Sequence, residues 1–234
     1  MLAQYTTAHR SCAMLKDLLY RWAFMLRILV TGFGPFGGSS INPSEMLARA
    51  ITSEPWPGAV MSCAVLPVIG GSGLDSCRAM LRRAIDAHQP AIVICLGESA
   101  RACHVTFERV AVNLRDDRIA DNAGVQWQDQ PVIESGPVAY FSSLPVRAMR
   151  DACEGEGVPA ILSTSAGTFL CNEIMYALLH GIEQGEFASV KSAGFIHLPQ
   201  LPEQAVERGG PSMPLAGMLV GLRASLLLLI PSLG

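Results

Sequence analysis

The chain has 234 residues, of which 50% are hydrophobic and 16% are charged, and its net charge is −3. This length and apolar content indicate a folded chain with a sizeable core and exclude a largely disordered one. The lack of a basic excess argues against a nucleic-acid partner, because such binding relies on side chains that neutralise phosphates.

The first 24 residues differ from the rest of the chain. They scatter charged side chains and lack the continuous apolar segment of a signal peptide. They also do not continue the α/β pattern that starts after Met25. We therefore expect residues 1–24 to form an extension outside the fold, through an upstream start codon or as a loosely attached helix. Residues 25–234 are expected to form one domain.

After Met25, short apolar runs that predict strands alternate with amphipathic segments that predict helices. The predicted strands cover residues 27–31, 59–66, 91–96, 105–114, 160–163 and 192–198. The predicted helices cover residues 43–51, 73–88, 145–155, 171–180 and 214–230, with a polar loop over 115–131. Nearly continuous apolar strands between helices indicate a largely parallel, twisted sheet covered on both faces, an α/β/α sandwich. Leu74, Cys77, Leu81 and Ile85 are expected on one face of the second helix.

Neither a membrane span nor a metal centre is expected. Residues 215–230 are the best candidate for a span, but they contain Arg223 and fall short of the ~20 residues that a bilayer requires. They predict a buried C-terminal helix instead. The seven cysteines are odd in number and include no CxxC pair, which argues against a disulfide framework or zinc and fits a reducing cytoplasm. We expect no metal and no other cofactor.

A glycine-rich segment, GFGPFG (32–37), follows the first predicted strand. It satisfies the dinucleotide-binding pattern G-x-G-x-x-G, but four residues intervene before Asn42–Pro43, where the helix is expected to start. A phosphate loop requires the helix N-terminus directly after the glycines. We therefore favour a tight loop at a strand end. Its two phenylalanines, Phe33 and Phe36, are expected either in the core or as walls of a small ring pocket.

Cys171 lies between a loop of small residues and a predicted amphipathic helix. A helix N-terminus carries unpaired N–H groups and the positive end of the dipole, which favour a thiolate over a thiol. This placement makes Cys171 a candidate nucleophile. The alternative is an inert buried cysteine, which is the commoner role of a free thiol.

A cysteine nucleophile needs a base, and the base needs a group that orients it. His197 is the histidine that follows an apolar strand, with a rigid loop expected over residues 198–204. Parallel sheets place their sites at such strand ends, where Gly32, Gly97 and Ser163 are also expected. Glu108 stands in a mainly apolar segment, where a carboxylate needs a partner. That partner is a histidine or, alternatively, Arg109 or Arg118.

The other histidines are weaker candidates for the base. His9 lies in the extension, and His104 has no evident partner. His88 and His180 are expected at helix C-termini, where histidines commonly cap carbonyl groups.

Four separate segments resemble the pyroglutamyl peptidase type I family, also called pyrrolidone-carboxylate peptidases, which are cysteine peptidases. In chain order they are TGFGPFGG (31–38) with NP (42–43), ERVAVN (108–113) with DRIADN (117–122), SAGTFLCN (165–172), and GFIHLP (194–199) with PEQ (202–204). The resemblance covers the chain from about Met25 to its end. It implies a single α/β/α domain that removes N-terminal pyroglutamate from peptides, usually as a cytosolic homotetramer.

The resemblance also implies roles for individual residues. The family's Cys–His–Glu triad falls on Cys171, His197 and Glu108. An arginine that supports the site, and the oxyanion with it, falls on Arg118. The phenylalanines of the substrate pocket fall on Phe33, Phe36 and Phe169.

Glu98 departs from the family pattern, because it takes the place of a glutamine that commonly contacts substrate. A charge there is expected to alter substrate affinity or its pH dependence. Two alternatives to a peptidase therefore remain at this stage. One is a non-catalytic or altered-specificity binding homologue, and the other is a nucleotide-binding enzyme that uses the loop of Gly32 to Gly37.

Overall fold

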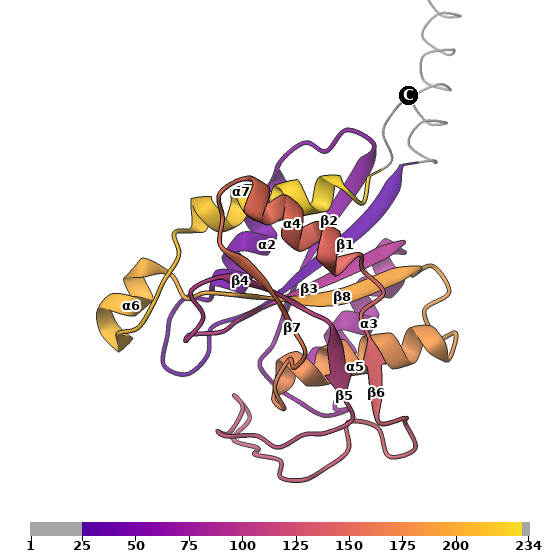
Figure 1. Cartoon of the computed structure of the whole chain (residues 1–234). Helices are drawn as coiled ribbons and strands as arrows, with labels where there is room; N and C mark the ends of the chain where they lie inside the picture. The colour runs from indigo at the N-terminus through magenta and orange to yellow at the C-terminus, as the bar shows by residue number, and fades with distance from the viewer. Residues whose placement is uncertain (1–24, 231–234) are drawn as a thin grey trace, which may run out of the picture.

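The computed structural model describes residues 25–230, and the expected extension over residues 1–24 lies outside them. The described chain contains one sheet of six strands with helices on both faces (Figure 1). Across the sheet, the strands are β2 (Ala59–Leu66), β1 (Leu26–Phe33), β3 (Ile92–Glu98), β8 (Ser192–Leu198), β4 (Val105–Glu108) and β7 (Ala160–Ser163). The expectation of an α/β sandwich is confirmed.

Six helices surround this sheet in the described chain. They are α2 (Pro43–Ser53), α3 (Cys77–His88), α4 (Val146–Gly155), α5 (Leu170–Glu183), α6 (Pro202–Arg208) and α7 (Leu215–Leu227). Helices α2, α4 and α7 contribute buried residues to the core on one face, and α3 and α5 to the core on the other. Figure 1 shows these two groups on opposite sides of the strands. Both faces are therefore buried, which explains the continuous apolar strands.

The sheet is mostly parallel. Strands β2, β1, β3 and β8 run in one direction, while β4 pairs antiparallel with β8 and parallel with β7. The carboxyl ends of β1, β3 and β8 therefore share one edge, and the site is built there. Ser163 ends β7, as expected, although β7 runs in the opposite direction to β1, β3 and β8.

Two predicted elements have different boundaries in the structure. Helix α3 starts at Cys77 because the side chain of Ser76 accepts a hydrogen bond from the Ala79 N–H and caps the helix. Leu74 precedes this cap and is 81% exposed, so it is not on the buried helix face. The predicted strand 105–114 divides after Glu108, since β5 (Val110–Val112) leaves the main sheet to pair with β6 (Ala139–Phe141).

The C-terminal part of the chain supplies two helices. The loop expected after His197 ends at Pro202, where α6 begins. Helix α7 has 13 residues and buries one face, which carries Met218, Leu222 and Leu226, so the expected C-terminal helix is present but is not buried all round. Within residues 25–230, no helix has the length and apolar character needed to cross a bilayer.

Candidate active site

Cys171 is the second residue of α5, which Phe169 precedes as the N-cap. The N–H groups of a first helical turn have no acceptor within the helix, so they are free to face a ligand near the thiol. The sulfur packs against the end of β3: a Cβ atom added at Gly97 would lie 2.9 Å from Cys171 Sγ. A glycine at this position therefore allows the helix to approach the strand.

Asn172 fixes this end of α5. Its side chain accepts a hydrogen bond from the Val112 N–H at 2.9 Å and donates to the carbonyls of Val112 and Leu114, both at 2.9 Å. Asn172 is fully buried. Because Cys171 directly precedes Asn172, these bonds to β5 and to Leu114 hold the thiol in place.

His197 and Glu108 form a hydrogen-bonded pair. His197 Nδ1 lies 2.8 Å from Glu108 Oε1, and Glu108 is only 2% exposed. Strands β8 and β4, which carry them, are neighbours in the sheet. Among the described residues, Glu108 makes no ion pair with Arg109 or Arg118, so the histidine alternative for its partner is the one observed.

The electrostatics of this pair extend to Cys171. Burial of the imidazole opposes its charged form, but the Cys171 thiolate and the Glu108 carboxylate outweigh this effect and raise the pKa of His197 from 6.5 to about 10. The imidazole therefore stays protonated at neutral pH next to Cys171. An imidazolium in this position can donate a proton.

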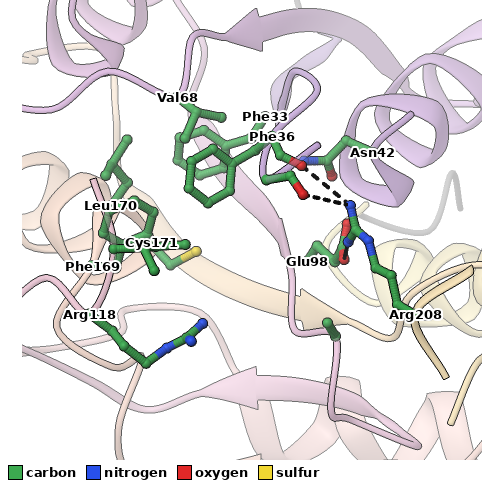
Figure 2. A pocket seen from close by; sticks show the side chains of 13 residues that line it. Phe33, Phe36, Asn42, Val68, Glu98, Arg118, Phe169, Leu170, Cys171 and Arg208 are labelled. Carbon is green, nitrogen blue, oxygen red and sulfur yellow. Dashed lines mark hydrogen bonds and ion pairs between the residues drawn. The ribbon is translucent and has the colours of Figure 1, made fainter. Parts of the chain in front are cut away.

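Two hollows meet at Cys171. The smaller, of about 370 Å³, is lined mainly by apolar side chains, including Phe33, Phe36 and Phe169. The larger, of about 690 Å³, is lined by His197 and Glu108, and Cys171 borders both. Figure 2 shows Phe33 and Phe36 on one side of the smaller hollow, with Phe169, Leu170 and Cys171 facing them.

The smaller hollow has polar groups at its rim. Glu98 ends β3 and lines it, and Glu98 is paired: Arg208 Nη1 donates to Oε1 at 3.2 Å, and Gln204 Nε2 donates to Oε2 at 2.9 Å. Arg118 borders both hollows, and no ion pair of Arg118 occurs within residues 25–230. The predicted site residues therefore lie together, around Cys171.

The chain is also similar to known proteins over most of its length. The pyroglutamyl peptidase family matches residues 26–230. The chain belongs to this family. A pyrrolidone-carboxylate peptidase from Streptomyces coelicolor is 46% identical over 202 residues, which cover 86% of this chain and 91% of that protein. One from Yersinia pestis is 43% identical over 203 residues, or 86% and 92% of the two chains.

Solved structures give the same result. Pyroglutamyl peptidase I from Bacillus amyloliquefaciens matches with a TM-score of 0.81 at 34% identity, over 86% of this chain and 95% of that one. Pyrrolidone carboxyl peptidase from Pyrococcus furiosus matches with a TM-score of 0.79 at 34% identity, over 87% and 97%. As a pyroglutamyl peptidase family member, the chain is a cysteine-type peptidase with an α/β fold.

Within this family member, the structure adds residues that the sequence analysis did not single out. They are Asn172 behind the nucleophile, and Arg208 and Gln204 beside Glu98. Asn172 could have been noticed as a polar residue at a buried helix position. Arg208 offered no such signal, because α6 was not predicted.

Two of the remaining histidines have polar partners of their own, and one of them, His104, lines the larger hollow. The Tyr140 hydroxyl lies 2.9 Å from His180 Nδ1, so this ring does not cap the helix end as expected. His104 Nδ1 lies 3.2 Å from Thr106 Oγ1, although no partner was evident from the sequence. Within residues 25–230, no cluster of three His, Cys, Asp or Glu side chains is close enough to hold a metal ion.

Proposed function

We propose that this peptidase hydrolyses the bond after an N-terminal pyroglutamyl residue, with Cys171 as nucleophile, His197 as acid and base, and Glu108 as the group that orients His197. The observation that carries the proposal is the placement of Cys171. It starts α5, borders both hollows, and shares the larger one with the His197–Glu108 pair. Membership of the pyroglutamyl peptidase family supports the substrate class.

In the acylation step, the Cys171 thiolate attacks the carbonyl carbon of the pyroglutamyl group. A C–S bond forms, and the carbonyl electrons move to oxygen. Backbone N–H groups at the start of α5 stabilise the oxyanion, and Arg118 lies beside it. The C–N bond then breaks, and protonated His197 gives its proton to the leaving amine.

In the deacylation step, water attacks the thioester. His197 takes a proton from this water as the C–O bond forms. The C–S bond breaks, pyroglutamate leaves, and the thiolate and imidazolium are restored. Glu108 holds Nδ1 throughout, which directs Nε2 to the reacting atoms.

The smaller hollow suits the pyroglutamyl ring, which is a neutral lactam. Its apolar walls would bury the ring carbons, and polar groups at the rim would satisfy the N–H and C=O. Phe36 and Phe169 already lie with ring centroids 5.5 Å apart, tilted by 33°. These two rings are already in contact, so no third ring fits between them. The lactam would therefore lie against the Phe36–Phe169 pair.

The rest of the peptide occupies the larger hollow. The family match over residues 26–230 supports a catalytic domain over residues 25–234, with residues 1–24 outside it. The resemblance described above supports a cytoplasmic location and a homotetramer, and light scattering of the purified protein would test the tetramer.

The direct test is hydrolysis of a pyroglutamyl-linked chromogenic amide. Wild-type protein should release the chromophore, and Cys171→Ala should lower kcat by at least about 10³-fold. Cys63→Ala is the matched control, because this half-buried cysteine on β2 borders neither hollow. Activity of Cys171→Ala at the wild-type level would overturn the nucleophile assignment, and an inactive wild-type protein would overturn the proposed function.

A further inference from the structure

Arg208 joins three segments at the rim of the smaller hollow. Its Nη1 donates to Glu98 on β3, and its Nη2 donates to the carbonyls of Phe36 and Gly37 in the glycine loop, both at 3.4 Å. Figure 2 shows these contacts, with the Arg208 guanidinium between Glu98 and the loop. The aromatic wall formed by Phe36 is thus tied to the same guanidinium that neutralises Glu98.

The backbone around Arg208 is fixed by two buried glutamines. Gln204 accepts from the Leu201 N–H at 2.9 Å, and Gln200 donates to the carbonyls of Gly209 and Pro211 at 2.7 and 3.0 Å. Both glutamines are almost fully buried. The short helix therefore presents Arg208 at a defined position, although its outer face is open, with Val206 87% exposed.

Glu98 needs this compensation. Its side chain is only 14% exposed and lines the hollow that would receive a neutral lactam. When a ring enters, water leaves this rim, and an unpaired carboxylate would lose hydration without gaining a counter-charge. With Arg208 in place, the negative charge of Glu98 is neutralised, and the pair presents a donor and an acceptor at the rim. A lactam offers the complementary pair, an N–H and a C=O.

We propose that Arg208 is a specificity-determining residue of the ring pocket, which neutralises Glu98 so that the pocket accepts an uncharged pyroglutamyl ring. This inference rests on the proposed function of the site. It gives the departure at Glu98 a structural explanation, since the charge and its counter-charge occur together. Arg208 does not act on the reacting bond, so its removal should change ring binding rather than the chemical step.

The test compares three variants on the pyroglutamyl amide: Arg208→Gln, Glu98→Gln, and the two combined. Arg208→Gln should raise KM about tenfold with kcat nearly unchanged, because a charge-assisted hydrogen bond is lost and Glu98 is left without its counter-charge. The double variant should recover most of this loss, since a neutral glutamine at 98 needs no counter-charge. Arg150→Gln is the control: Arg150 forms ion pairs on α4, has a similar 25% exposure, and borders neither hollow.

The outcomes separate this inference from the proposed function. The rate at which iodoacetamide alkylates Cys171 should be unchanged in Arg208→Gln, which shows that the nucleophile is intact. A double variant with a KM as high as that of Arg208→Gln would overturn the inference, because a structural role alone predicts no recovery. An unchanged KM in Arg208→Gln would also overturn the inference about Arg208. The proposed function would still hold in that case, provided that the wild-type protein hydrolyses the substrate. A wild-type protein without activity would overturn both.

Discussion

His197 interacts with both Glu108 and Cys171, and each of them raises the pKa of its imidazole. Glu108 holds Nδ1 at 2.8 Å, and the Cys171 thiolate contributes to raising the pKa of the imidazole to about 10. The ordinary value is 6.5, so the shift extends the protonated form far into the alkaline range. Activity that depends on an imidazolium beside a thiolate should therefore persist above neutral pH and fall only as the pH approaches about 10.

Replacing Glu108 by glutamine should move this alkaline limit. A neutral amide keeps a polar contact to Nδ1 but removes one of the charges that raise the His197 pKa. The alkaline limb of kcat/KM should therefore shift to lower pH, by about one unit or more, together with a lower maximal rate. A pH profile of both proteins measures this shift. An alkaline limb at the wild-type position would contradict the role given to Glu108.

The sequence could predict the triad because each member lies in a local setting of its own: a helix start, a strand end and an apolar segment. It could not predict Arg208 as the partner of Glu98. These residues are separated by 110 positions, and a glutamate at a strand end does not specify which of 17 lysines and arginines will reach it. Only the packing of α6 beside the glycine loop brings them together.

At the scale of elements, the start of α5 and the end of β3 form one unit. Gly97 lies where a Cβ atom would come within 2.9 Å of Cys171 Sγ and 2.6 Å of Phe195 Cζ. Phe195 in turn packs on His197, with ring centroids 4.8 Å apart. Helix α5 can therefore approach the sheet only because the next-to-last residue of this strand is a glycine.

Gly97→Ala should displace the nucleophile or the ring behind the base. A misplacement of about 1 Å can cost about 10²-fold in rate, so kcat should fall by roughly that factor. Gly155→Ala is the matched control, because nothing lies within 4 Å of a Cβ atom at that position. Steady-state kinetics measure kcat for both variants. Full activity of Gly97→Ala would show that the contact does not constrain Cys171.

Helix α5 also carries a buried ion pair. Arg115 Nε lies 3.1 Å from Glu173 Oε2, and both side chains are at most 5% exposed. Glu173 accepts a hydrogen bond from the Gly71 N–H at 2.8 Å, and the Arg115 guanidinium lies over the Trp127 ring at 4.5 Å. Burial raises the pKa of Glu173 against the lowering effect of Arg115. The pair thus joins α5 to the loop that contains Arg118.

Arg115→Met should lower the free energy of unfolding by about 3 kcal/mol or more, because it leaves Glu173 buried without its closest counter-charge. Arg49→Met should cost less than about 1 kcal/mol, since the Arg49–Glu45 pair lies on the surface of α2. Urea unfolding measures both values. Equal losses in the two variants would contradict a special contribution from the buried pair.

Whether a segment forms a helix or a strand was easier to predict than the residues at which it begins and ends. The strand over residues 59–66 and the C-terminal helix follow from apolar patterns that tertiary packing does not alter. Helix α6 was missed because a segment of seven residues with two exposed glutamates gives no clear periodicity. The division between β4 and β5 was also missed, because strand partners rather than propensity end the first of them.

At the scale of the molecule, one face of the sheet contributes core residues to the site and the face covered by α7 does not. The core that includes α3 and α5 also contains Phe33 and Leu170 at the site, whereas α7 lies on the other face and borders neither hollow. Figure 1 shows α7 far from the start of α5, across the strands. Strand direction was the feature of this architecture that composition could not predict, since β4 and β7 are as apolar as strands that run the opposite way.

This separation predicts that stability and substrate binding can be changed independently. Leu222 on α7 is fully buried, so Leu222→Ala should lower the free energy of unfolding by about 2–5 kcal/mol. KM for the pyroglutamyl amide should stay at the wild-type value at temperatures where the variant is folded. Urea unfolding and steady-state kinetics on one preparation test both statements. A large rise in KM would show that the two faces are coupled.

The most direct test of the triad is to identify the covalent intermediate. Wild-type enzyme is mixed with a pyroglutamyl ester, quenched in acid during turnover, digested, and examined by mass spectrometry. The pyroglutamyl group should appear as a thioester on the peptide that contains Cys171 and on no other cysteine peptide, and it should be absent from Cys171→Ala. An acyl group on a different residue, or turnover by Cys171→Ala, would contradict the assignment of Cys171 as the nucleophile.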